Sequence, residues 1–229
     1  TGTAGILVSA TGENAIVVAL GANAHLQSRD LKRAWLENAK IVIAQCESNL
    51  TATLAALKVA RRAGALTLLN PAPMRDDFDP DILRWVDVLI PNETEFVSLQ
   101  QRIGAPVVKK GKPRNDLARL SSVEMQRRCR SFGVETVIVT LGSQGCVLSR
   151  PEKATALPGF KVDAVDTTGA GDAFVGGFAA GLLQHPGDLL AATHYAMGVA
   201  ALSVTRVGTA PAMPWKREVK RFLLQQRQA

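Results

Sequence analysis

From residue 41 onward, short apolar runs alternate with longer stretches in which apolar positions recur with helical spacing. The short runs predict buried strands, and the longer stretches predict amphipathic helices. The predicted strands are residues 41–44, 66–69, 86–90, 136–140 and 146–148. A short helix is predicted at residues 31–38, before this alternation, and further helices are predicted at residues 51–63, 79–84, 93–101, 121–133, 173–184, 189–204 and 215–226. This alternation predicts a single α/β domain over residues 1–229, with a mostly parallel sheet covered by helices on both faces.

Two further apolar runs, residues 5–9 and 15–20, come before this alternation begins. They are separated by the turn sequence Thr11-Gly12-Glu13-Asn14. Apolar runs joined by such a turn predict a β-hairpin. Residues 104–120 are polar and predict a loop.

Polar or conformationally special residues directly follow four of the predicted strands. These segments are residues 45–47, 70–73, 91–95 and 140–142. The carboxyl ends of parallel strands lie at the same edge of a sheet, and ligands in such folds bind there. The sequence therefore predicts one crevice into which the four segments face.

The chain carries a formal net charge of +7, and only 5% of its residues are aromatic. Because the basic clusters lack interleaved aromatic side chains, a solvated basic surface is favoured over nucleic-acid binding. No apolar run is long enough to predict a membrane span. Cys46, Cys129 and Cys146 form no CxxC pair, which predicts reduced thiols and a cytoplasmic location.

The sequence Gly169-Ala170-Gly171-Asp172 precedes an apolar helical run. A glycine-rich turn at a helix start directs several backbone N–H groups and the positive end of the helix dipole at one point, which suits a phosphate. Asp172 would repel that phosphate, but it could accept a proton from a hydroxyl that attacks the phosphorus. The motif indicates phosphoryl transfer to an alcohol. Alternatively, the glycines shape the turn and the acid favours the helix dipole.

Two other motifs each allow two interpretations. Asn92 and Glu95 share one face of a predicted helix start, where they could hold the water shell of Mg²⁺ or form a capping box. Residues 140–145, Thr-Leu-Gly-Ser-Gln-Gly, form a segment with two glycines at the end of a predicted strand. These glycines would let the backbone approach a nucleotide, or they would simply form a tight turn.

In this order, the motifs together resemble the PfkB carbohydrate kinase family, and within it the ribokinases. The segments that carry the resemblance are residues 21–24, Glu47, and residues 70–73, 91–95, 140–145 and 166–172. The resemblance implies a three-layer α/β/α fold in which residues 5–20 are part of a β lid. It also implies ATP-dependent phosphorylation of the primary hydroxyl of a sugar. Ribose is the first candidate, with fructose, deoxyribose or a nucleoside as alternatives.

The resemblance also implies roles for individual residues. Asp172 would be the catalytic base, and the backbone of Gly169, Ala170 and Gly171 would form the anion hole for the transferred group. Asn92 and Glu95 would organise Mg²⁺ and the phosphates. The nucleotide-contacting positions would be Asn92, Thr140, Leu141, Gly142, Ser143, Gln144, Gly145, Gly171 and Met197, the last near the adenine. Glu47 would bind sugar hydroxyls. An activating K⁺ would lie at Asp166, Thr168, Ser203, Arg206, Gly208 and Ala212.

Members of this family have additional residues ahead of the part that corresponds to Thr1. In those members, the additional residues supply the first strands, a Gly-Gly sugar-binding loop and the rest of the lid. We therefore expect the domain to be incomplete at its N-terminus, and a non-catalytic nucleotide-binding remnant or regulatory subunit is the alternative to an active kinase. Homodimerisation through the lid is expected if the missing part is supplied.

Overall fold

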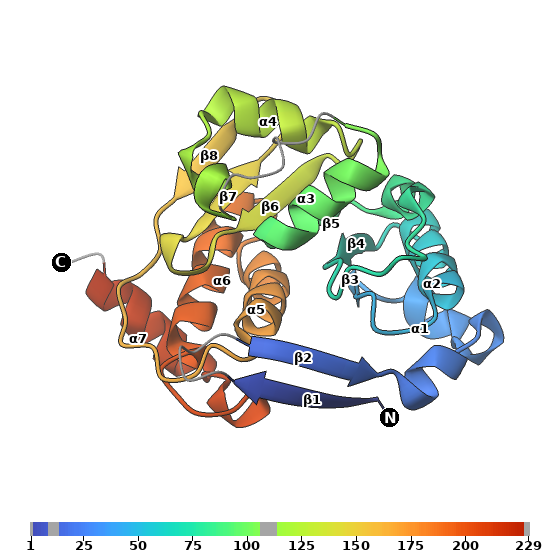
Figure 1. Ribbon diagram of the computed structural model, residues 1–229, viewed down its shortest axis with the longest axis horizontal. Helices are drawn as coiled ribbons and strands as arrows, with labels where there is room; N and C mark the ends of the chain where they lie inside the picture. The colour runs from blue at the N-terminus through green and yellow to red at the C-terminus, as the bar shows by residue number, and fades with distance from the viewer. Residues whose placement is uncertain (1, 9–13, 106–113, 227–229) are drawn as a thin grey trace. The chain divides into compact units, whose positions relative to one another are not determined.

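The computed structural model describes residues 2–8, 14–105 and 114–226. The chain forms two compact units, Thr1–Asp87 and Val88–Ala229, coloured blue to cyan and green to red in Figure 1. None of the helices in the described residues has the length and apolar character needed to cross a membrane.

The first unit opens with the predicted hairpin. Strands β1 (Thr3–Val8) and β2 (Asn14–Ala19) pair in antiparallel fashion, with Thr3 opposite Ala19. The strand pairing confirms the prediction to within two residues, whereas most of the predicted turn lies outside the described residues. Three short helices follow: η1 (Gly21–His25), η2 (Ser28–Asp30) and α1 (Arg33–Glu37).

A parallel strand pair forms the centre of the first unit. Strands β3 (Ile41–Ala44) and β4 (Leu66–Leu69) have the predicted bounds and are joined by α2 (Leu50–Arg62). Helix α2 packs on both strands, and its buried face includes Leu57 and Ala60. Asn49 caps its start by accepting the N–H of Thr51 at 2.9 Å. A 3-10 helix, η3 (Pro80–Trp85), follows β4.

In the second unit, the described residues include four paired strands. Strand β5 (Val88–Leu89) is parallel to β6 (Thr136–Thr140), and β7 (Cys146–Ser149) and β8 (Ala154–Leu157) continue the sheet in antiparallel order. The predicted strand 86–90 is therefore too long. Val86 caps η3, and its N–H donates to the carbonyl of Leu83, so it is not available to a strand.

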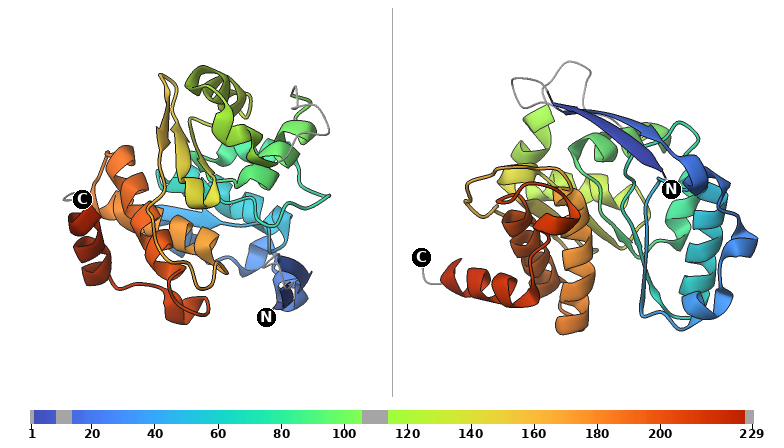
Figure 2. Two further views of the ribbon diagram at one scale, coloured as in Figure 1. Left: turned by 60° about the vertical axis from the view of Figure 1, so that its left-hand side comes forward. Right: turned by 90° about the horizontal axis from the view of Figure 1, so that it is seen from below.

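The helices of the second unit largely follow the prediction. They are α3 (Glu93–Arg102), η4 (Arg114–Arg119), α4 (Ser122–Arg130), η5 (Gly142–Gln144), α5 (Ala170–Gln184), α6 (Leu189–Ser203), η6 (Ala210–Ala212) and α7 (Lys216–Gln226). Both views in Figure 2 show α5 and α6 side by side, in orange. The two helices can approach closely because Gly181 has no side chain. A Cβ at this position would lie only 2.8 Å from the Cα of Ala192.

Helix α4 begins as predicted but ends earlier than predicted. Ser121 accepts the N–H of Glu124, as expected of an N-cap. The Glu124 carboxylate pairs with Arg127 and Arg128, and no reciprocal capping-box bond forms. The helix ends at Arg130, earlier than the predicted end at Gly133. The predicted loop 104–120 contains η4, and its residues 106–113 lie outside the described residues.

Candidate functional site

The second unit contains a cavity of about 790 Å³. Its wall is built from the start of α3, the end of β6 with the turn that follows, residues 159–164, the start of α5 and part of α6. Most of the site residues predicted in this unit belong to these elements. The volume is typical of a pocket for a small organic ligand.

The glycine-rich turn forms one side of this cavity. Gly169 is the N-cap of α5 and has a left-handed backbone with φ of 77°. A Cβ at this position would lie 3.2 Å from Cγ2 of Thr209, so the site favours glycine both by conformation and by space. The helix begins at Ala170, not at residue 173 as predicted, and Ala170 and Gly171 belong to the cavity wall. The N–H groups of a first helical turn have no acceptor within the helix, so this turn favours an anion.

Asp172 also lies in the first turn of α5. Its side chain is exposed, and it follows Gly171 directly, although Asp172 itself does not line the cavity. A carboxylate in this position stays accessible to a hydroxyl group that approaches from outside the cavity. The arrangement is compatible with a proton acceptor beside an anion-binding turn.

Asp166 connects two loops of the site. Its Oδ1 accepts the N–H of Thr168 at 2.9 Å, and its Oδ2 accepts the N–H of Gly208 at 2.9 Å. The hydrogen bond from Gly208 is the main cause of a lowered Asp166 pKa, and the bonds from Thr168 add to it. The carboxylate thus ties the segment that leads into the glycine-rich turn to the loop that follows α6.

This connection predicts a pH-dependent stability difference. Because the pKa of folded Asp166 is depressed, its stabilisation is present above the ordinary Asp pKa of about 4 and is lost as the pH falls through the folded pKa. Asp166→Asn should therefore lower the Tm at neutral pH, and the difference from wild type should shrink as the pH falls from about 5 to about 2.5. Thermal melts across this range would measure it, with Asp163→Asn as an exposed control from the same segment. A difference that stays constant with pH would contradict the role of Asp166.

Asn92 and Glu95 form a complete capping box at the start of α3. The Asn92 Oδ1 accepts the N–H of Glu95 at 2.9 Å, and the Glu95 carboxylate accepts the backbone N–H of Asn92 at 2.9 Å and its Nδ2 at 2.8 Å. Glu95 is buried, and burial raises its pKa, whereas the hydrogen bond from Asn92 opposes this rise. Asn92 lines the cavity, whereas Glu95 does not.

The capping box does not exclude a role near Mg²⁺. The pair places the Asn92 amide at the cavity wall, and the Glu95 carboxylate holds this amide by a hydrogen bond. Such an amide suits contact with the water shell of a hydrated Mg²⁺ ion, which needs few direct protein ligands. Within the described ranges, no three His, Cys, Asp or Glu side chains come together as a possible metal-binding group. The Mg²⁺ assignment stays a prediction.

Residues 140–145 reach the same cavity. Thr140 forms a parallel bridge with Asn92, and its N–H donates to the carbonyl of Pro91 at 3.0 Å, so the ends of β5 and β6 deliver both side chains to one edge. The turn closes through the N–H of Leu141, which donates to the carbonyl of Gly145 at 2.8 Å. Thr140, Gly142, Ser143 and Gly145 line the cavity, whereas Leu141 and Gln144 do not.

Gly145 and Gly159 bring two backbones into direct contact. A Cβ on Gly145 would lie 2.0 Å from the carbonyl oxygen of Leu157, and one on Gly159 would lie 2.2 Å from that of Ser143. Both positions therefore exclude every side chain. This contact fixes the turn 142–145 against residues 159–164, which supply a large part of the cavity wall.

Another part of the cavity wall is apolar. Met197 of α6 is buried and lines the cavity together with Phe174, Ala200 and Val204. Phe160 reaches the cavity from residues 159–164, and its ring also packs edge-to-face against His194 and Phe222. Such a surface suits a flat heterocyclic ring.

The remaining predicted positions are only partly brought together. Asp166, Thr168 and Gly208 are joined as described. The nearby loop contains Arg206, whose guanidinium pairs with Glu218, and buried Ala212, which offers no side-chain oxygen. Ser203 donates through Oγ to the carbonyl of Ala200. The K⁺ assignment stays a prediction.

Glu47 belongs to the first unit, where it is exposed just after β3.

Sequence reasoning missed the wall formed by residues 159–164 and by Phe174. The sequence Pro158-Gly159 is typical of a turn, and nothing in its pattern distinguishes a turn that packs against another backbone from one in solvent. Phe174 was assigned only to an apolar helical run, because helix periodicity does not tell a core position from a cavity position.

Comparison with known proteins places this geometry in a family. The model of the pfkB family carbohydrate kinases matches residues 1–216. The chain is 37% identical to ribokinase from Mus musculus over 96% of its own length and 66% of that protein's length. It is 34% identical to deoxyribokinase from Salmonella typhi over 97% of its own length and 69% of that protein's length. The chain thus spans about two thirds of the length of the relatives it matches.

A solved structure supports the same assignment. Arabidopsis thaliana ribokinase, in complex with ribose and ATP, matches 97% of this chain and 69% of its own length, with 27% sequence identity and a TM-score of 0.79. This likeness confirms the predicted fold class, a mostly parallel three-layer α/β/α arrangement. With a family model that matches nearly the whole sequence, the chain belongs to the pfkB family of carbohydrate kinases.

Proposed function

We propose that this chain transfers the γ-phosphoryl group of ATP to the primary hydroxyl of a sugar. The observation that carries the proposal is the first turn of α5, where an exposed carboxylate follows a glycine that borders a cavity of nucleotide size. The relatives named as ribokinase and deoxyribokinase make ribose and 2-deoxyribose the leading acceptors. Fructose and nucleosides are further candidates within the family.

The polar and apolar parts of the cavity wall support ATP as the donor. Its polar wall contains Asn92, Thr140 and Thr167, and its apolar wall contains Met197 and Phe174. A nucleoside triphosphate has the same division, with charged phosphates at one end and a flat base at the other. The start of α5, at Ala170 and Gly171, also lines the cavity, so the positive end of the helix dipole favours the phosphates there.

The chemistry follows from the same residues. Asp172 would accept the proton of the sugar hydroxyl, and the backbone N–H groups of the glycine-rich turn would stabilise charge on the transferred group. Bound Mg²⁺ would neutralise the phosphate oxygens, and Asn92 supported by Glu95 would hold its water shell. Catalysis in this scheme comes mainly from positioning and electrostatics.

The acceptor would be held by the first unit. Glu47 is an exposed residue in the loop that follows the parallel strand β3, and ligands of such sheets bind at this end of the strands. Its oxygens would accept hydrogen bonds from sugar hydroxyls. The proposal has three further parts. The β1–β2 hairpin would belong to the lid of this site, and the lid would support dimerisation. K⁺ would activate the enzyme by binding at the loops that Asp166 joins.

Measuring ADP release in the presence of ATP and Mg²⁺ tests the proposal. The chain would be assayed with ribose, 2-deoxyribose, fructose and adenosine in turn, and ATP binding would be followed separately by calorimetry. Sugar-dependent ADP release is expected. ATP binding without ADP release for any acceptor would replace the kinase proposal with that of a non-catalytic nucleotide-binding protein.

A further inference from the structure

The loop that carries Glu47 is attached to the loop after β4. At its start, the Nε2 of Gln45 donates to Oδ1 of Asn70 at 3.0 Å. One residue later, the N–H of Cys46 donates to the carbonyl of Ala72 at 2.9 Å. These two bonds hold the part of the loop that precedes Glu47. All four residues that form them belong to the first unit.

Arg75 holds the part of the loop that follows Glu47. Its Nη1 donates to the carbonyl oxygen of Ser48 at 3.1 Å. The Ser48 side chain in turn forms a hydrogen bond of 2.9 Å with Oγ1 of Thr53 in helix α2. Glu47 thus lies between residues whose backbone is fixed on both sides, with Cys46 before it and Ser48 after it.

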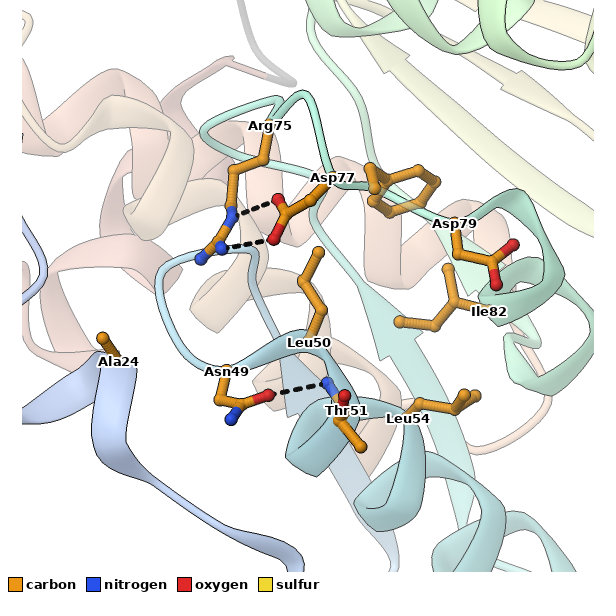
Figure 3. Close-up of a pocket in the computed structure, with 10 residues that line it drawn as sticks. Ala24, Asn49, Leu50, Thr51, Leu54, Arg75, Asp77, Asp79 and Ile82 are labelled. Atoms are coloured by element: carbon orange, nitrogen blue, oxygen red, sulfur yellow. Dashed lines mark hydrogen bonds and ion pairs between the residues drawn. The ribbon is translucent and has the colours of Figure 1, made fainter.

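Asp77 fixes the orientation of the Arg75 guanidinium. Nε and Nη2 of Arg75 donate to the two carboxylate oxygens of Asp77 at 2.8 and 2.7 Å, as the paired dashed lines in Figure 3 show. This pair forms part of the wall of a cavity of about 340 Å³ in the first unit. The hydrogen bond with Asp77 is the main cause of a raised Arg75 pKa, so the side chain stays charged. The planar fork leaves Nη1 directed at Ser48.

We propose that Arg75 is a positioning residue of the acceptor site, which orients Glu47 by holding the carbonyl of Ser48 and does not contact the substrate. This inference rests on the proposed function, in which Glu47 binds the sugar. The side chain of Arg75 is only 24% exposed, whereas that of Asp77 is 62% exposed. The arginine is therefore the member of the pair that packs against the protein, where it contacts Ser48. A surface ion pair alone contributes little to stability, whereas the third bond of Arg75 attaches it to the loop that carries Glu47.

Arg75→Lys separates positioning from charge. Lysine keeps the positive charge, but its single ammonium group cannot form two parallel bonds with Asp77 and also donate to Ser48. The KM for ribose should rise about tenfold, because small displacements of a binding group have large effects, whereas the KM and Kd for ATP should stay within about twofold. Arg84→Lys is the matched control: this arginine lies in the same unit, is exposed and pairs with Asp81.

Amide hydrogen exchange provides a readout that does not depend on turnover. Peptides that cover residues 45–49 should exchange faster in Arg75→Lys than in wild type or in Arg84→Lys. Peptides that cover residues 140–145 should exchange at equal rates in all three proteins.

The outcomes distinguish this inference from the proposed function. An unchanged KM for ribose in active Arg75→Lys, or equal increases of both KM values, would overturn the positioning role. If wild-type protein phosphorylates no acceptor, the proposed function fails. In that case, unchanged exchange at residues 45–49 still rejects the attachment of this loop by Arg75, and faster exchange supports it.

Discussion

Asp172→Asn should lower the turnover of sugar phosphorylation by about two to four orders of magnitude and leave ATP affinity nearly unchanged. Asparagine has similar size and occupies the same first helical turn, but it cannot accept the proton of the attacking hydroxyl. Asp172 is exposed, so this substitution does not disturb the hydrophobic core. Rates of ADP release at saturating ATP and ribose would measure the loss, and calorimetry would measure ATP binding.

Glu135→Gln is a suitable control for this experiment. Glu135 is also an exposed acid of the second unit, but it lies just before β6, at the opposite end from Thr140. Its replacement should leave turnover unchanged. Near-full activity of Asp172→Asn would show that another group accepts the proton, and a parallel loss of ATP binding would show that Asp172 acts on the nucleotide.

Gly145→Ala should reduce both stability and ATP affinity. Gly145 has φ of 96° and ψ of −130°, a conformation almost restricted to glycine, and its Cβ would lie 2.0 Å from the carbonyl oxygen of Leu157. Backbone strain and overpacking together should lower the free energy of unfolding by about 2–6 kcal/mol. The contact that fixes turn 142–145 against residues 159–164 would be lost, so the Kd for ATP should rise at least about tenfold. Urea unfolding and calorimetry would measure the two effects.

Gly133→Ala isolates the effect of backbone conformation. Gly133 also has a positive φ, of 68°, but a Cβ there meets nothing within 4 Å. This variant should lose about 1–2 kcal/mol of stability and keep its ATP affinity. If Gly145→Ala behaved like Gly133→Ala in both measurements, the close backbone contact would have no role in the nucleotide site.

Much of the secondary structure could be predicted because local signals and tertiary context agree. The strands 41–44, 66–69 and 136–140 have the predicted bounds. The second and third are largely buried, as continuous apolar runs between turn residues predict, whereas strand 41–44 is not: only Val42 is buried and Ile43 is exposed. Strand 86–90 was overpredicted because Val86 forms the cap of a 3-10 helix, a competition that hydrophobicity does not reveal. Strand β8 was missed because residues 154–157 form a short segment without a continuous apolar run, and only Ala154 of the four is buried.

The site could be predicted where its chemistry is carried by adjacent residues. The glycine-rich turn, the Asn92–Glu95 pair and the turn 140–145 are short motifs, and the structure brings elements of all three to one cavity. The contact between Gly145 and Gly159 and the two bonds of Asp166 depend on the path of the backbone through space. A single sequence gives the residue types at these positions but not the distances between them.

The central claim is that a phosphoryl group passes directly from ATP to a sugar hydroxyl at the first turn of α5. Incubation with ATP labelled in its γ-phosphate, followed by chromatography of the products, tests this most directly. The label should appear in a ribose phosphate, in equal amount to the ADP formed, and only with ribose or a close analogue present. Label that appears only as inorganic phosphate, or that stays in ATP at every acceptor concentration, would contradict the claim.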